Sequence, residues 1–198
     1  MAKLQLVLDM GGVLITNLTP GMWEELAAGS HVTYAELRER YKQDLKHMLW
    51  TGELTLEQFW SWISQQCTAV DTAQMDGLVQ KHLLKLPAWE HLEGWSERAE
   101  LHILSNHRQE WIGPILAPIH ELLSSITISS QSGCCKPYPD IYAAAASKLQ
   151  TSAPVLFVDD QEKNLREAAK LGWMTLLADE AGEWIRRVDA LLADEVGE

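Results

Sequence analysis

Short apolar runs alternate with helical patterns of apolar and polar residues along this chain. The runs are rich in leucine, isoleucine and valine, and turn residues bound them, as is typical of buried strands. We expect strands at Leu4–Leu8, Leu101–Leu104, Ile126–Ile128, Val155–Val158 and Met174–Leu177. Because helical segments separate most of these runs, the pattern predicts an α/β fold with a parallel sheet and helices on both faces.

The segment between the first and second expected strands breaks this alternation. It carries only helical patterns, at Met22–Ala28, Tyr34–Met48, Leu56–Cys67 and Ala73–Leu86. Thr33 and Thr55 are expected N-caps, since Glu36 and Gln58 follow three residues later, as in a capping box. Pro87 is expected to end the helical run. We therefore expect residues 17–87 to form a helical insertion, and residues 1–16 and 88–198 to form the α/β core domain.

Composition and charge exclude several classes of partner. The chain has 198 residues, of which 46% are hydrophobic, enough for one full-sized core with a small added module. Its formal net charge is −12 and no basic cluster is visible, so nucleic acid and anionic membranes are poor partners. The apolar runs are too short to span a bilayer. With no secretory signal pattern and only three cysteines, we expect a cytoplasmic protein; the sequence does not indicate its oligomeric state.

Polar residues follow the expected strands at the points where these strands end. Asp9 follows the first strand and opens a glycine-rich turn through Gly11 and Gly12. The later strands are followed by Ser105-Asn106, by Lys136 in a loop, and by Asp159-Asp160. Because the carboxyl ends of parallel strands meet at one edge of the sheet, we expect these side chains to converge there.

Such a convergence has a clear chemical reading. Neighbouring carboxylates raise each other's pKa, so they need a cation between them, and Mg²⁺ is the hard divalent ion that suits oxygen ligands best. The ion and Lys136 then form a positive pocket beside Asp9, to which Ser105 and Asn106 add hydrogen-bond donors. A phosphate is the ligand that such a pocket suits.

The strand-end motifs resemble those of a known family. In order, they are similar to the four motifs of the haloacid dehalogenase superfamily: Asp9-Met10-Gly11-Gly12-Val13, Leu104-Ser105-Asn106, Lys136-Pro137 and Val158-Asp159-Asp160-x-x-x-Asn164. Within it, the Gly52-Glu53-Leu54-Thr55 segment and the run from Lys136 to Tyr142 are most similar to the sugar-phosphatase branch that includes α-D-glucose-1-phosphate phosphatase. The resemblance covers essentially the whole chain.

This resemblance implies a fold and a set of site residues. It implies a Rossmann-like sheet of order 5-4-1-2-3, with the helical insertion acting as a cap. It implies Mg²⁺ held by Asp9, by the main-chain carbonyl of Gly11, and by Asp159 or Asp160. Asp9 would attack a small phosphorylated metabolite and form an aspartyl-phosphate, with Lys136 as the second catalytic residue. Ser105, Asn106, Lys136, Gly11 and Gly12 would bind the phosphate, and closure of the cap would select the substrate.

The sequence departs from the commonest phosphatase pattern at Gly11. Most phosphatases of the superfamily carry there a second aspartate that acts as general acid and base, whereas the resembling sugar-phosphatase branch also has glycine. We infer a leaving group that needs little protonation, such as the anomeric oxygen of a sugar 1-phosphate. Two other functions stay open: a catalytically weak or inactive module that binds a phosphate or a partner, and a 2-haloacid dehalogenase, which would need no Asp-Asp metal pair.

Three further residues are candidates for the site. His107 follows the second motif directly and is a candidate base for the water that hydrolyses the acyl-phosphate. Trp23 and Trp50 fall in the helical insertion and are candidates for substrate contact, although plain burial explains most tryptophans as well.

Overall fold

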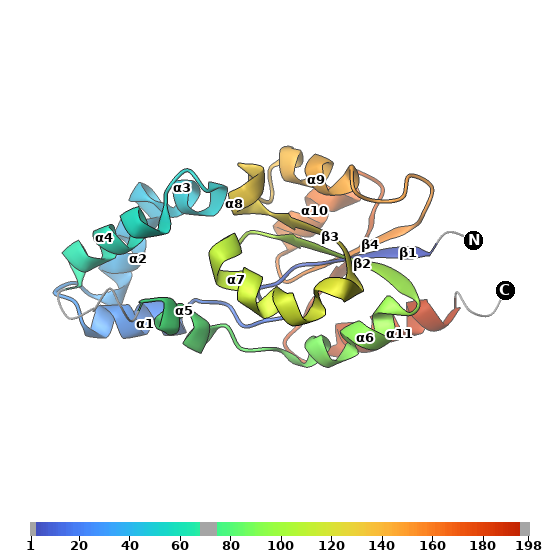
Figure 1. Cartoon of the computed structure of the whole chain (residues 1–198), viewed down its shortest axis with the longest axis horizontal. Helices are drawn as coiled ribbons and strands as arrows, with labels where there is room; N and C mark the ends of the chain where they lie inside the picture. The colour runs from blue at the N-terminus through green and yellow to red at the C-terminus, as the bar shows by residue number, and fades with distance from the viewer. Residues whose placement is uncertain (1–2, 68–74, 195–198) are drawn as a thin grey trace.

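A five-stranded parallel sheet forms the centre of the computed structural model, which describes residues 3–67 and 75–194. The strands are β1 (Leu4–Leu8), β2 (Ala99–Ser105), β3 (Leu123–Ile128), β4 (Val155–Asp159) and β5 (Met174–Leu177). Their order is β3-β2-β1-β4-β5, which is the predicted order read from the opposite edge (Figure 1). The predicted α/β class and strand order are therefore confirmed. Strands β2 and β3 begin earlier than predicted, in stretches where polar residues interrupt the apolar runs.

Helices cover both faces of this sheet, because alternate residues of each strand point to opposite faces. Leu4, Leu6 and Leu8 of β1 belong to a core that includes apolar residues of α6 (Leu92–Ser96) and α11 (Glu183–Asp194). Val7 belongs to a second core on the other face, with residues of α9 (Pro139–Ala146) and α10 (Glu162–Ala169) (Figure 1). Shorter elements complete this part: α7 (Gln109–Leu116), α8 (Ser129–Ser132) and the 3-10 helices Pro87–His91 and Ala117–Leu122.

A group of helices between β1 and β2 lies beyond the carboxyl ends of the strands (Figure 1). They are α1 (Gly21–Ala28), α2 (Tyr34–Asp44), α3 (Lys46–Thr51), α4 (Leu56–Gln66) and α5 (Met75–His82). Both predicted capping boxes are present. No helix among the described residues is both apolar and long enough to cross a bilayer.

Three of the predicted helix boundaries need comment. The single helix expected at Tyr34–Met48 is two helices, because Leu45 has φ −129°, outside the helical range, and its side chain is buried. Helix α5 ends at His82, so Pro87 does not end it but begins a 3-10 turn instead. The expected helix start at Ala73 lies outside the described residues.

The segment from Leu49 to Leu54 connects these helices to the core through contacts with Ser130 and Arg108. Gly52 has φ +82°, and a Cβ atom on it would lie only 2.1 Å from the backbone oxygen of Ser130 in α8. The buried guanidinium of Arg108 donates Nη1 hydrogen bonds to the carbonyls of Leu49, at 3.1 Å, and Leu54, at 2.8 Å. Glycine at position 52 therefore permits a backbone contact between the inserted helices and the core.

Replacing Gly52 by alanine tests this contact, and Gly133 is the matched control. Gly133 also has a left-handed φ, of +69°, but nothing lies within 4 Å of its missing Cβ. Gly133→Ala is expected to lower the free energy of unfolding only by the cost of a left-handed φ at alanine, about 1–2 kcal/mol. Gly52→Ala is expected to cost about 1 kcal/mol or more beyond that, because the backbone of Ser130 has to move. Urea denaturation measures both, and equal losses would contradict the proposed close contact.

Candidate active site

Asp9 lies at the end of β1 and is only 5% exposed. Its Oδ1 accepts a 2.7 Å hydrogen bond from the backbone N–H of Met10, and the side chain of Ser105 also hydrogen-bonds to it. The turn that follows depends on Gly12, which has φ +72°. A Cβ atom there would lie 2.4 Å from Oδ2 of Asp160, so the glycine allows the motif-four loop to approach Asp9 closely.

Lys136 links two carboxylates in the middle of the site. Its buried ammonium lies 2.8 Å from Oδ2 of Asp9 and 2.6 Å from Oδ2 of Asp159, and it donates a 3.0 Å hydrogen bond to the carbonyl of Leu104. Asn106 holds the main chain of Lys136 from both sides: its Nδ2 donates to the Lys136 carbonyl at 2.8 Å, and its Oδ1 accepts from the Lys136 N–H at 2.7 Å. The side chain of Asn106 thus orients the lysine loop, and its contact with a phosphate stays a prediction.

The three predicted acidic residues converge. Oxygen atoms of Asp9, Asp159 and Asp160 lie within 4.8 Å of one another. Such a cluster of oxygen donors fits a hard divalent cation such as Mg²⁺, which the charge of the carboxylates calls for.

The two neighbouring aspartates differ in how many partners they already have. Asp159 is fully buried, and its oxygens accept hydrogen bonds from Lys136, from the backbone of Gln161 and from the amide of Asn164. Asp160 is partly exposed, and from the residues that the structure describes it accepts two long bonds, at 3.2 Å from Asn17 and 3.3 Å from the Gln161 side chain. Asp160 therefore has lone pairs free for a cation, whereas those of Asp159 are engaged in positioning Lys136.

Burial sets the charge state of the lysine and the first carboxylate. Burial raises the pKa of Asp9 to about 7, against the lowering effect of the Lys136 charge, and the charge of Asp159 raises it further. Burial by itself lowers the pKa of Lys136, but the charges of Asp9 and Asp159 outweigh it and raise that pKa above its ordinary value. Lys136 therefore stays charged, while a cation bound beside Asp9 would favour the ionised carboxylate.

Asn17 occupies the space next to Gly11, and nothing in its sequence context indicated this. A Cβ atom on Gly11 would lie 2.5 Å from Oδ1 of Asn17. The amide of Asn17 also donates to Asp160, as described above. The place from which an aspartate at position 11 would project is therefore filled by an amide contributed from farther along the same loop.

His107 is built as a donor rather than as a base. Burial lowers its pKa to about 4, so its ring is neutral at pH 7. Its Nδ1 accepts a 3.0 Å hydrogen bond from the backbone N–H of Arg108, which leaves the proton on Nε2. The ring also packs edge-on against Trp50 and Trp111. This environment disfavours the predicted role as a general base.

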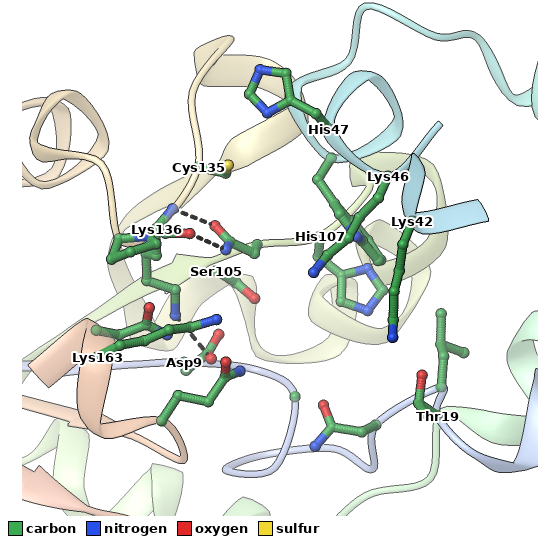
Figure 2. Close-up of a pocket in the computed structure, with 18 of the residues that line it drawn as sticks. Asp9, Thr19, Lys42, Lys46, His47, Ser105, His107, Cys135, Lys136 and Lys163 are labelled. Carbon is green, nitrogen blue, oxygen red and sulfur yellow. Dashed lines mark hydrogen bonds and ion pairs between the residues drawn. The ribbon is translucent and has the colours of Figure 1, made fainter. Parts of the chain in front are cut away.

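A cavity of about 590 Å³ lies between this sheet edge and the inserted helices (Figure 2). Asp9, Ser105 and Lys136 line one side of it. Trp23 and Trp50 both line it from the inserted helices, so they are placed where the predicted substrate contact requires them, although that contact stays a prediction. Lysine and arginine side chains from α2, α3 and α10 also line it, and no sequence motif pointed to them.

Comparison with known proteins agrees with this architecture. A family model described as haloacid dehalogenase-like hydrolase matches residues 6–172. A predicted HAD-like hydrolase from Porphyromonas gingivalis is similar in structure, with a TM-score of 0.76 and 21% identity over 97% of this chain and 98% of that one. No curated protein matches the sequence.

Two further solved structures differ in what they contain. A HAD family enzyme from Bacteroides thetaiotaomicron, in complex with magnesium and inorganic phosphate, has a TM-score of 0.74 and 21% identity over 89% of this chain and 94% of that one. L-2-haloacid dehalogenase from Xanthobacter autotrophicus, with chloropropionic acid covalently bound, has a TM-score of 0.58 and 18% identity over 88% and 76%.

The raised pKa of Asp9 predicts a pH-dependent stability in metal-free protein. The unfolded carboxyl ionises near pH 4, whereas the folded one keeps its proton until about pH 7, so folding loses stability as the pH rises through this window. Relative to Asp9→Asn, the wild type should lose roughly 2–4 kcal/mol of unfolding free energy between pH 4 and pH 8. Urea denaturation in EDTA measures the difference, which excess Mg²⁺ should reduce. Parallel pH profiles of the two proteins would contradict the assignment.

Proposed function

Because this chain belongs to the haloacid dehalogenase-like hydrolase family, we propose that it is a Mg²⁺-dependent phosphatase acting on a small phosphomonoester, such as a sugar 1-phosphate. The observation that carries this proposal is the contact of Lys136 with Asp9 and Asp159 in a cluster that includes Asp160, with Asp9 and Lys136 lining a cavity. Residues 17–87 would form the cap that covers this cavity.

The first chemical step uses groups of this chain. A carboxylate oxygen of Asp9 attacks phosphorus, the new O–P bond forms an aspartyl-phosphate, and the bond from phosphorus to the leaving oxygen breaks. Lys136 neutralises charge that develops on the phosphoryl oxygens, and the hydroxyl of Ser105 donates a hydrogen bond to them. The site residues fit Mg²⁺, which Asp9, Asp160 and the carbonyl of Gly11 would hold. When bound, the ion would supply positive charge to the phosphate oxygens.

The second step is hydrolysis of the aspartyl-phosphate: a water oxygen bonds to phosphorus, the bond from phosphorus to the Asp9 oxygen breaks, and the released inorganic phosphate keeps the water's proton. The structure offers no aspartate at position 11 to take up the water's proton, and His107 is a hydrogen-bond donor. The same lack of an acid affects the first step, where no aspartate can protonate the leaving oxygen. A leaving group that departs without a proton suits such a site. The anomeric oxygen of a sugar 1-phosphate is of this kind, because a hemiacetal oxyanion is less basic than an ordinary alkoxide.

Two other functions are weighed against this proposal. The B. thetaiotaomicron relative contains magnesium and phosphate, and the X. autotrophicus relative is a dehalogenase. At these identities both speak for the fold alone, so the choice rests on this chain's own residues. The carboxylate cluster favours a metal-dependent phosphatase over halide displacement. The absence of an acid at Gly11 keeps open a binding module without turnover.

Phosphate release from small phosphoesters tests the proposal. We expect wild-type protein with Mg²⁺ to hydrolyse p-nitrophenyl phosphate, and to prefer α-D-glucose 1-phosphate to glucose 6-phosphate. EDTA and Asp9→Asn should each abolish turnover, and Lys136→Ala should lower kcat by about 10²-fold or more. Chloride release from L-2-chloropropionate that survives EDTA would favour the dehalogenase instead, and metal binding without any phosphate release would favour the binding module.

The different environments of the two aspartates predict different defects. Asp160→Asn removes the less engaged carboxylate and should raise the Mg²⁺ concentration for half-maximal activity about tenfold or more. Asp159→Asn should mainly lower kcat, because Lys136 loses the partner that orients it. Asp140→Asn, an exposed change on α9, is the control. A larger shift in Mg²⁺ requirement for Asp159→Asn than for Asp160→Asn would reverse the assignment.

A further inference from the structure

The cavity above Asp9 is far more basic than the rest of the molecule. Its lining holds five lysine or arginine side chains and one carboxylate, namely Arg38, Lys42, Lys46, Lys136, Lys163 and Asp9. The whole chain has only 16 lysine and arginine residues against 28 aspartate and glutamate residues. Random placement of charge on so acidic a chain would not gather these cations in one hollow, and a cavity of one sign attracts ligands of the other.

The cations outside the catalytic set come from two sides of the cavity. Arg38 and Lys42 lie one turn apart on α2, and Lys46 begins α3. Figure 2 shows Lys42 and Lys46 reaching from these helices into the cavity, which Lys163 of α10 also lines. The guanidinium of Arg38 lies over the rings of Trp23, at 4.6 Å, and Tyr41, at 5.3 Å, which hold it in place.

Three of these four cations have no anionic partner among the described residues. Within residues 3–67 and 75–194, no carboxylate pairs with Arg38, Lys46 or Lys163, and Lys42 has only a 3.8 Å contact with Glu39. The pKa of Lys46 lies below its ordinary value because burial disfavours its charge and because Lys163, Arg38 and Lys42 repel it. The group is thus one mutually repelling cluster, and a bound anion would relieve that repulsion.

The hydrolysed phosphate alone does not account for this cluster. Two of the three carboxylates at the sheet edge contact Lys136, and a divalent cation would offset much of the remaining negative charge. The phosphoryl group bound there brings about two negative charges. Two of the four other lining cations, Arg38, Lys42, Lys46 and Lys163, would balance these charges, which leaves two of them without a counterpart.

We propose that Arg38, Lys42 and Lys46, together with Lys163 of α10, form a second anion subsite. The substrate would then carry a second phosphate or a carboxylate, besides the phosphate that is hydrolysed. This inference rests on the proposed phosphatase function for the identity of the first group. It narrows the substrates from small phosphomonoesters in general to those with a second anionic group, namely bisphosphates and phosphorylated acids.

Binding to Asp9→Asn protein with Mg²⁺ tests the subsite without turnover. Calorimetry compares two matched pairs: α-D-glucose 1,6-bisphosphate with α-D-glucose 1-phosphate, and 3-phosphoglycerate with glycerol 3-phosphate. In at least one pair, the ligand with the extra anionic group should bind about tenfold more tightly or better. The first pair tests a second phosphate and the second a carboxylate. Equal affinities within both pairs would overturn the inference.

Variants of Arg38 and Lys46 test whether these residues cause the preference for the second anionic group. In the Asp9→Asn background, Arg38→Gln and Lys46→Gln should each reduce the preference about fivefold or more. Arg40→Gln is the control on the same helix, since Arg40 bonds to Gln66 and does not line the cavity. Lys81→Gln is the control for lysine, since Lys81 pairs with Glu25 away from the cavity. A preference that survives in both Arg38→Gln and Lys46→Gln would overturn the assignment of the subsite to these residues, provided that circular dichroism shows both variants folded.

Turnover by the protein with Asp9 intact separates this inference from the proposed function. Phosphate release without any preference for the second anionic group overturns the subsite alone. A binding preference that depends on Arg38 and Lys46, without phosphate release from any ligand, overturns the phosphatase and supports the subsite.

Discussion

The buried ammonium of Lys136, held between Asp9 and Asp159, is the interaction on which the site depends. Three buried charges in one place are stable only when they compensate each other and their remaining polar groups are satisfied. The structure meets this condition with neighbours from β2 and α10: the Leu104 carbonyl accepts from Lys136, the amide of Asn106 just after β2 holds the main chain of Lys136, and the amide of Asn164 in α10 donates to Asp159. The parallel sheet supplies that geometry, because it brings the ends of β1, β2 and β4 to one edge.

The same edge explains why two consecutive aspartates have different environments. Asp159 ends β4 and is enclosed by the lysine and by the first turn of α10, so its charge is used inside the protein. Asp160 lies one residue beyond the strand, beside Gly12 and Asn17, and faces outward. The position of Asp160 therefore depends on Gly12, which leaves room for its side chain, and on Asn17, which donates a hydrogen bond to it.

The sequence allowed the parallel sheet and the convergence of the three aspartates to be predicted from local pattern and strand polarity, whereas the strand order was predicted from the resemblance of the strand-end motifs to a known family. Leu45 shows a limit of local pattern: the helical periodicity continues through it, yet its φ of −129° interrupts the helix. Asn17, Arg38, Lys46 and Lys163 were missed for a related reason. They lie in loops or on helix faces where such residues are ordinarily solvated, and only the tertiary arrangement turns them toward one cavity. His107 was noticed, but its donor role depends on a backbone N–H that no motif reveals.

The lining of the cavity is divided between two stretches of the chain. The reactive groups belong to the sheet edge, whereas Arg38, Lys42 and Lys46 belong to α2 and α3, and Gly52 and Arg108 make contacts between the end of α3 and the core. Replacement of one cavity-lining residue on α2 or α3 therefore leaves the residues at the strand ends unchanged. Single substitutions on these two helices can therefore change ligand recognition during evolution, while the reactive groups at the sheet edge are conserved.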